Sequence, residues 1–222
     1  MIRGLVIIAV GGAAFAAVAI SASGAFHTRS WQFPGMSMFE DGDSDHGGRI
    51  NLSGHEPRIE RDLTWAGGSK LTFEVPAEIQ FTQGPTSKIT LSGPDVIVSH
   101  VVLDGDTIRL DRHVSGAWHN DDALKITITA PALHDFSLDS AQSLHISDLN
   151  TDSLAISING AGSVTVAGQA KSADITLAGL GQANLADLTL GNARIEIDGL
   201  GHVKAGPTGN VRVEINGAGA VT

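Results

Sequence analysis

Four copies of one short pattern occupy the last third of the chain: Asn159-Gly160-Ala161-Gly162, Ala178-Gly179-Leu180-Gly181, Asp198-Gly199-Leu200-Gly201 and Asn216-Gly217-Ala218-Gly219. The first glycines of successive copies lie 19, 20 and 18 residues apart. A nearly constant period of this length is typical of stacked repeats, in which each repeat contacts its neighbours. The pattern therefore indicates an architecture, and it points to no particular chemistry.

Apolar and polar residues alternate before each first glycine. Such a period of two marks a β-strand with one buried face. A second alternating stretch follows each corner, and a polar turn such as residues 168–172 leads to the next copy. The aliphatic positions two, four and six residues before the first glycine are Ile158, Leu177, Ile197 and Ile215; Ile156, Ile175, Ile195 and Val213; and Leu154, Ala173, Ala193 and Val211.

A single unit of strand, corner and strand cannot bury its apolar face alone. Stacking equivalent strands about 4.8 Å apart would enclose a continuous aliphatic interior between parallel sheets. We therefore predict an all-β chain that folds as a right-handed parallel β-helix, or solenoid, with coils of about 19 residues. The right hand is expected because parallel crossovers are nearly always right-handed. In this fold Ile156, Ile175, Ile195 and Val213 are vertical neighbours inside the column.

The corner glycines are predicted to be structural turn residues. Either a positive φ or a close approach between coils would exclude a Cβ at these positions. Asn or Asp directly before the first glycine is common in such turns. The predicted turn residues are Gly160, Gly162, Gly179, Gly181, Gly199, Gly201, Gly217 and Gly219.

Further strands are predicted upstream of the repeats, so that the β-helix domain covers residues 49–222. A fifth, worn copy begins at His134, where Ser140 and Gln142 replace the two glycines. The exported region shows no convincing apolar period of 3.6 residues, which a helix would require. Other alternating stretches predict strands at residues 71–75, 78–81, 88–91, 96–103, 107–112 and 125–129.

The N-terminal segment has a different character. After Arg3, residues 4–26 carry no charge and are rich in Ala, Ile and Val. Residues 1–26 are long enough to cross a bilayer as a helix, which takes roughly 20 residues, and Arg3 favours a cytoplasmic N-terminus. A cleaved signal peptide is the alternative, because Ser23-Gly24-Ala25 offers small residues at a cleavage position. The domain is thus expected in the bacterial cell envelope, anchored in the inner membrane and facing the periplasm, or secreted after cleavage.

Composition excludes several classes of function. The 222-residue chain carries a formal net charge of −10 at pH 7. This charge argues against nucleic acid as a main partner, because nucleic-acid binding needs clustered Lys and Arg. The chain has no cysteine, which excludes disulfides, thiol catalysis and Cys-based zinc or iron–sulfur sites. No cofactor is expected.

Three stretches upstream of the corners are distinctive in their order: Phe73-Glu74-Val75-Pro76-Ala77-Glu78-Ile79, Gly105-Asp106-Thr107-Ile108-Arg109-Leu110 and Lys125-Ile126-Thr127-Ile128-Thr129-Ala130-Pro131-Ala132-Leu133. Together with the Gly-x-Gly corners, they resemble a known bacterial family, the head GIN domain, which is named as a "putative auto-transporter adhesin" and is formally a domain of unknown function. The resemblance covers roughly residues 48–222 and implies an exported right-handed β-helix without transferable catalytic residues. The family's usual Ser-Gly-Ala-Gly corner appears here as Asn159-Gly160-Ala161-Gly162, and Leu180 and Leu200 replace the alanine in two copies.

Residues 27–48 form an acidic, aromatic-containing linker with one weak metal candidate. Asp41, Asp43 and Asp45 alternate there like the start of a calcium loop. A complete EF-hand loop also needs Gly at its sixth position and Glu at its twelfth, and the sequence has neither there. A solvated acidic linker is the simpler interpretation.

A second weak metal candidate is the polar cluster at residues 111–122. His113 and His119 lie near several carboxylates and could ligate a metal if the segment folded back on itself. The flanking strands favour a solvated hairpin loop instead.

The sequence contains no convincing catalytic constellation. The Gly-x-Gly corners lack the third glycine and the following helix of a dinucleotide fingerprint. A β-helix can carry paired carboxylates on an outer sheet face, as polysaccharide-cleaving enzymes do, and Asp174, Glu196 and Glu214 are outward candidates. Arg194 and Arg212 lie among them, so a ladder of cross-strand ion pairs is the simpler interpretation.

The sequence therefore predicts a non-enzymatic, exported β-solenoid that acts as an interaction, adhesion or structural module of the cell envelope. The alternative is a polysaccharide-binding or polysaccharide-cleaving β-helix protein. Expected partners are the membrane, through the N-terminal helix, and an envelope protein or polysaccharide. The chain stops at Thr222, just past the last corner, so self-association through the edge of the C-terminal coil is a further hypothesis.

Overall fold

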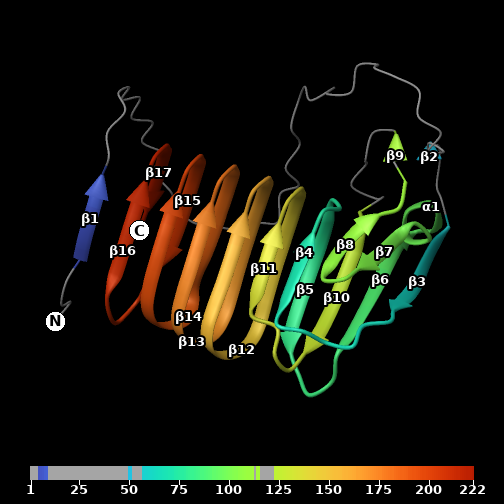
Figure 1. Cartoon of the computed structure of the whole chain (residues 1–222), viewed down its shortest axis with the longest axis horizontal. Coiled ribbons are helices and arrows are strands. Elements are labelled where there is room, and N and C mark those ends of the chain that lie inside the picture. Colours follow the sequence, from blue (N-terminus) through green and yellow to red (C-terminus); the bar gives the residue numbers. More distant parts are fainter. Residues whose placement is uncertain (1–4, 10–49, 52–56, 113, 116–122) are drawn as a thin grey trace.

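The computed structural model describes residues 5–9, 50–51, 57–112, 114–115 and 123–222. They form one large sheet, wound into a stack of coils, and a separate two-stranded sheet of β2 with β9 (Figure 1). The first half of the elements are β1 (Leu5–Ala9), β2 (Ile50–Asn51), β3 (Arg58–Leu63), β4 (Lys70–Phe73), β5 (Ala77–Gln83), β6 (Lys88–Pro94), α1 (Asp95–Val98), β7 (Val101–Asp104) and β8 (Thr107–Leu110). The others are β9 (Val114–Ser115), β10 (Lys125–Ala130), β11 (Asp135–Leu138), β12 (Ala141–Ile158), β13 (Ala161–Leu177), β14 (Leu180–Ile197), β15 (Leu200–Ala205), β16 (Val211–Ile215) and β17 (Ala218–Val221).

The repeats form a parallel β-solenoid of about four turns. Strands β12, β13 and β14 each bend around a whole coil, and β12 pairs in parallel with β13, and β13 with β14, over most of their length. Ile156 pairs with Ile175, Ile175 with Ile195, and Ile195 with Val213. These four side chains are at most 6% exposed. The prediction that they are vertical neighbours in an aliphatic column is confirmed.

The worn fifth copy is the first coil of the stack. Phe136 in β11 pairs with Ile156 in β12, and Gln142 occupies the register position of Gly162 in the next coil. Phe136 is fully buried, and its ring centroid lies 5.3 Å from that of Phe81 in β5. Aromatic packing therefore fills the column where the solenoid meets the strands that precede it.

The first glycine of each corner is required by the close approach of successive coils. A Cβ at Gly179 would lie 2.1 Å from the carbonyl oxygen of Gly160, and a Cβ at Gly199 would lie 2.1 Å from that of Gly179. Real Cβ atoms do not approach a backbone oxygen so closely, and the atom they would meet belongs to rigid backbone. None of the eight corner glycines is among the described residues with a positive φ. Of the two explanations considered, close approach is the correct one here.

At the bends on the side of the coils away from the Gly-x-Gly corners, the chain turns through residues with a positive φ and through β-bulges. Gly168 has a φ of +133°, and Asp148 has a φ of 55°. The ladder between neighbouring coils shifts register beside these bends, between Ile146 and Leu149 and between Thr165 and Ala167. Residues 168–172, predicted as a polar turn, are instead paired strand within β13, because the bend is made by a bulge and does not interrupt the ladder.

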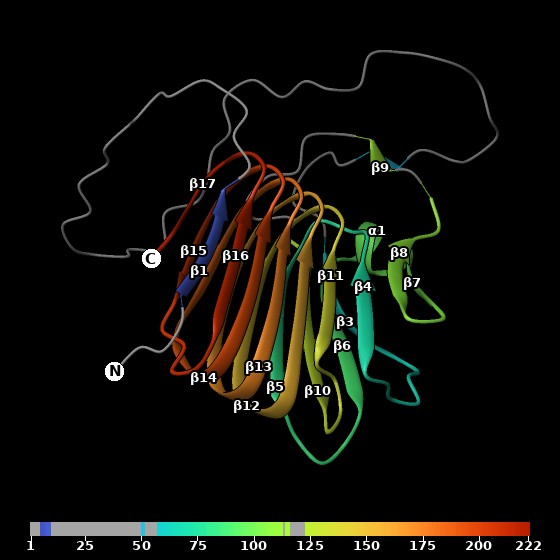
Figure 2. The ribbon, with the colours of Figure 1, turned by 60° about the vertical axis from the view of Figure 1, so that its left-hand side comes forward.

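Antiparallel strands close the end of the solenoid that lies nearest β11. β10 pairs in parallel with β5 and antiparallel with β6, and β3 then pairs antiparallel with β6. On the other face β8 pairs with β4, and β7 completes that sheet as an antiparallel neighbour of β8. Figure 2 shows this mixed end against the regular parallel coils.

The edge strand β3 carries charged side chains. The Asp62 carboxylate accepts a hydrogen bond from Thr90 Oγ1 at 2.7 Å and lies 3.1 Å from Lys88 Nζ, and these two contacts lower the pKa of Asp62. The Arg61 guanidinium donates to the carbonyl oxygens of Ser99, at 3.1 Å, and of Val101. Charged residues on an edge strand discourage pairing with another chain.

One predicted strand is wrong in part. The sequence predicts a strand over residues 96–103, whereas the structure has the short helix α1 followed by β7. Ile97 and Val98 are adjacent and both are fully buried, which one strand with a single buried face cannot achieve. The Ser99 hydroxyl donates to the Asp95 carboxylate at 2.5 Å, a local bond that favours the helical turn.

The N-terminal segment differs from its prediction where the structure describes it. Leu5–Ala9, inside the predicted anchor or signal at residues 1–26, form β1, which pairs in parallel with β16. A short apolar run rich in β-branched residues suits a strand as well as a helix, and the edge of β16 offers it a partner. The rest of residues 1–26 and the linker, residues 27–48, lie outside the described residues. In the part of the chain that the structure describes, no helix is long and apolar enough to span a membrane.

Gln142 joins the first coil to the strands that precede it. Its Nε2 donates to the carbonyl oxygens of Phe73, at 2.8 Å, and Val75, at 3.0 Å, and its Oε1 accepts from the backbone N–H of Ser140 at 3.1 Å. Gln142 is 6% exposed, and no other polar or charged side chain of the described residues is buried. An amide is needed here because only an amide can donate to two carbonyls and accept from an N–H at once.

We expect Gln142→Leu to destabilise the domain by about 2 kcal/mol, because the Val75 carbonyl and the Ser140 N–H lose their buried partner while the volume is nearly kept. Urea unfolding of the variant, compared with Gln182→Leu at an exposed corner position further along the repeats, measures the effect. Equal stabilities of the two variants would show that the hydrogen bonds of the Gln142 side chain do not link the first coil to the strands that precede it.

Candidate binding surface

An apolar ridge runs along the Gly-x-Gly corners. Ala161, Leu180, Leu200 and Ala218 pair in register from coil to coil, so their side chains form one line along the axis of the solenoid. We call these four residues the corner ridge. Leu180 is 46% exposed and Leu200 is 56% exposed, and they are the exposed large hydrophobic side chains of the described residues. The neighbouring coils place only a methyl group at the same position.

A row of polar, mostly uncharged side chains lies beside the corner ridge. Ser163, Gln182 and His202 are exposed and pair in register two positions after the ridge residues. The backbone beneath them is a regular parallel ladder, so the row and the ridge are held on a rigid frame. Such a surface, an aliphatic line flanked by hydrogen-bonding groups, suits contact with a macromolecule more than chemistry on a small substrate.

The charged side chains before the corners form ion pairs with one another. Arg194 Nη2 lies 3.2 Å from Glu196 Oε2 on the same strand, and Arg194 Nε lies 3.9 Å from Asp174 on the neighbouring coil. In the last coil Arg212 Nη2 lies 3.8 Å from Glu214 Oε2. The predicted ladder therefore runs along the strands as well as across them. Each of the three carboxylates considered as a catalytic candidate has an arginine partner.

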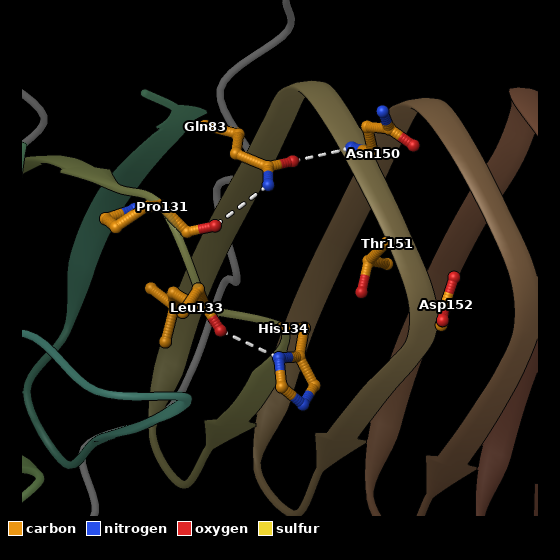
Figure 3. Close-up of a pocket in the computed structure, with 8 residues that line it drawn as sticks. Gln83, Pro131, Leu133, His134, Asn150, Thr151 and Asp152 are labelled. Atoms are coloured by element: carbon orange, nitrogen blue, oxygen red, sulfur yellow. Dashed lines mark hydrogen bonds between the residues drawn. The ribbon is translucent and has the colours of Figure 1, made fainter. Parts of the chain in front are cut away.

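A shallow polar pocket of about 310 Å³ lies between the end of β5, the segment before β11 and the bend of β12 (Figure 3). Gln83 spans it, because its Nε2 donates to the Pro131 carbonyl at 2.9 Å and its Oε1 accepts from the Asn150 N–H at 2.6 Å. The sequence does not predict this pocket, since its residues come from three separate segments. It is lined by Gln83, Pro131, Ala132, Leu133, His134, Asn150, Thr151 and Asp152.

Two ionisable side chains of the pocket lining each bond to a neighbouring group. His134 Nδ1 donates to the Ala132 carbonyl at 2.7 Å. Asp152, the carboxylate of the lining, pairs with Lys171 at 2.6 Å, and both side chains are more than three-quarters exposed.

The metal candidates from the sequence lie outside the described residues. Asp41, Asp43 and Asp45 belong to the linker, and His113 and His119 belong to the segment between β8 and β10. Within the described ranges, no group of three or more His, Asp or Glu side chains is arranged to hold a metal ion.

A family model with the description "Putative auto-transporter adhesin, head GIN domain" matches residues 69–222. The chain belongs to the head GIN domain family. The match contains β4, every strand of the solenoid after it, and all eight corner glycines. The expected resemblance is thereby confirmed.

A solved structure shares the fold of this head GIN domain. A protein of Bacteroides fragilis described as a "putative adhesin" aligns with a TM-score of 0.60 and 22% identity, over 78% of this chain and 98% of that one. A "putative lipid binding protein" of Parabacteroides distasonis aligns with a TM-score of 0.40 and 13% identity, over 79% and 100% of the two chains. No curated protein matches the chain.

The corner ridge of this head GIN domain was visible in the sequence only as a departure from the repeat. Leu180 and Leu200 stand where the other two corners have alanine. The sequence does not show that these two leucines are neighbours. They become neighbours on an exposed corner only when the coils stack in register.

Proposed function

We propose that this head GIN domain is a non-enzymatic, right-handed β-solenoid exported to the cell envelope, where it acts as an interaction or adhesion module. The observation that carries the proposal is the corner ridge, on which Leu180 and Leu200 stay exposed at positions that need only a methyl group. Exposed aliphatic side chains on a rigid frame mark a contact surface.

A protein partner is favoured over a polysaccharide. Sugar rings are commonly bound by stacking on exposed aromatic side chains, whereas the large aromatic rings among the fully buried residues, Phe73, Phe81 and Phe136, fill the core. The exposed large hydrophobics of the described residues are the two leucines alone. Aliphatic anchors flanked by polar groups match a protein surface of mixed polarity.

The proposed location follows from the family and from the N-terminal sequence. The family description refers to an adhesin associated with auto-transport, which supports a place in the envelope or outside the cell. Residues 1–26 supply the proposed anchor or signal. The anchored form would hold the solenoid at the periplasmic face of the inner membrane, and cleavage after Ala25 would release it.

Photo-crosslinking of the full chain in living cells tests the contact surface. A photoreactive residue replaces Leu200 on the corner ridge, or Asp187 at the exposed opposite bend as the matched control. We expect a discrete protein adduct from position 200 and none from position 187. Equal adducts from both positions, or an adduct that contains only glycan, would contradict a protein contact at the ridge.

The same experiment has a mutational arm. Leu180→Ala, which restores the residue found at the other corners, should lower the adduct from position 200 about tenfold, which corresponds to about 1.4 kcal/mol of binding free energy. Thermal stability should change little, since exposed substitutions usually alter it by less than about 0.5 kcal/mol. Ser163→Ala in the polar row serves as the control and should leave the adduct unchanged.

A further inference from the structure

The edge of β16 is the place where the solenoid accepts another strand. One side of β16 pairs with β14, and the other side pairs with β1 from Leu5↔Val211 to Ala9↔Ile215. Figures 1 and 2 show β1 lying beside β16 at the end of the stack. The occupant of this edge comes from a segment more than 200 residues away in the sequence. The edge is therefore competent for pairing with a strand that is distant in the sequence.

The charges of the last two coils do not suit a parallel neighbour. Arg194 pairs in register with Arg212, and Glu196 with Glu214, so like charges face each other across the strands. Like charges directly opposite one another destabilise a sheet. Ion pairs along each strand, at 3.2 Å and 3.8 Å, offset this repulsion only in part. Leu5–Ala9 contain no charged residue, so β1 offers neither Arg212 nor Glu214 a partner of opposite sign.

An antiparallel neighbour with the sequence of β16 would satisfy both charges. The strand reads Val211-Arg212-Val213-Glu214-Ile215, with opposite charges placed symmetrically about Val213. If a second copy pairs antiparallel with Val213 at the two-fold axis, Arg212 lies opposite Glu214 of the second copy, and Glu214 lies opposite its Arg212. Val211 then lies opposite Ile215 of the second copy on the apolar face. A two-fold interface of this kind is self-complementary and closes as a dimer.

We propose that the β16 edge is a self-association site, at which a second copy of this chain pairs antiparallel about Val213 in competition with the chain's own β1. The opposite end of the solenoid is less suited to this role, because Arg61 of its edge strand β3 is already bonded to the carbonyls of Ser99 and Val101. The pairing does not depend on what the corner ridge binds.

The state of the N-terminal segment decides whether the β16 edge is occupied. Leu5–Ala9 cannot cross a bilayer and pair with β16 at the same time. A chain whose N-terminal residues are inserted in the membrane, or removed, therefore presents a vacant β16 edge. The second copy then takes this edge.

Cysteine crosslinking of the full chain in membranes tests the proposal, because the chain has no native cysteine. Residues directly opposite in an antiparallel pair have Cα atoms about 4.5–5.5 Å apart, within the range of a disulfide. Val213→Cys should therefore give a covalent dimer on mild oxidation, at least tenfold more than Ile195→Cys, which lies one coil inside the stack. A dimer yield no greater than that of Ile195→Cys would overturn the proposal.

The double variant Ile7→Cys, Val213→Cys reports on the competing strand, because these two residues pair in the structure. In membranes we expect disulfides that join position 213 of one copy to position 213 of the other to exceed the intrachain disulfide. A purely intrachain disulfide in membranes would overturn the proposal.

Charge reversal tests the register without a crosslink. Arg212→Glu converts both intermolecular ion pairs into like-charge pairs and should weaken the dimer of the detergent-solubilised full chain about tenfold in sedimentation equilibrium. The exchange of both residues, Arg212→Glu with Glu214→Arg, restores opposite charges across the two-fold axis and should return the dissociation constant to within about threefold of the original. Identical constants for the single and double variants would overturn the proposed register.

Discussion

Gly199→Ala is expected to destabilise the domain by about 4 kcal/mol or more, although it adds a single methyl group to a surface corner. The new Cβ would lie 2.1 Å from the carbonyl oxygen of Gly179 in the coil below. The coils would have to separate locally, which breaks ladder hydrogen bonds such as the one from the Leu200 N–H to the same carbonyl, 3.0 Å long. For a domain of this size the melting temperature should fall by about 8–16 °C.

Gly206→Ala is the matched control. A Cβ at Gly206 would meet no atom within 4 Å, and this residue has no positive φ. The substitution should be neutral or stabilise the domain by up to about 1 kcal/mol, because alanine restricts the unfolded chain. Circular dichroism melts of the two variants side by side give the comparison. Similar melting temperatures would mean that the corners are not in backbone contact.

Ile175→Ala should cost about 3–4 kcal/mol of unfolding free energy. Ile175 lies between Ile156 and Ile195 in the column and is 1% exposed, so its removal leaves a cavity that the ladders above and below prevent from collapsing. Urea unfolding measures the change. Thr176→Ala, the next residue on the outward face, should alter the free energy by less than about 0.5 kcal/mol. A loss below about 1 kcal/mol at Ile175 would be incompatible with a closed column.

Periodicity was sufficient to predict the solenoid because apolar and polar residues alternate along each strand, so that one face is buried and the other is exposed. The residues two, four and six positions before each glycine are all aliphatic, and the structure stacks them in register. The position of Gln142 was also visible, as a substitution in the worn copy. Its role was not, since the carbonyls of Phe73 and Val75 that it binds lie almost 70 residues upstream.

Other features depend on contacts that no local pattern records. The helix α1 interrupts an alternating stretch because Ile97 and Val98 both find buried positions in the tertiary structure. The polar pocket at Gln83 and His134 arises where three segments meet. The pairing of Leu5–Ala9 with β16 illustrates the same limit, because a short apolar run suits a strand, a membrane helix and a signal peptide alike.

The fold alone does not determine what this head GIN domain binds, since function depends on particular surfaces placed on the fold. Two such surfaces distinguish this chain. The corner ridge presents Leu180 and Leu200 outward, and the β16 edge carries a charge pattern that is symmetric about Val213. We propose a protein partner for the first surface and another copy of the chain for the second.

The most direct test of the account is a measurement of methyl contacts between isoleucines of successive coils. In a solenoid with strands about 4.8 Å apart, selectively labelled Ile156, Ile175 and Ile195 should give nuclear Overhauser effects between 156 and 175 and between 175 and 195. Ile175→Val should shift or remove both contacts together. Absence of both effects in the folded protein, with the isoleucine signals otherwise resolved, would contradict the stacked column and every inference built on it.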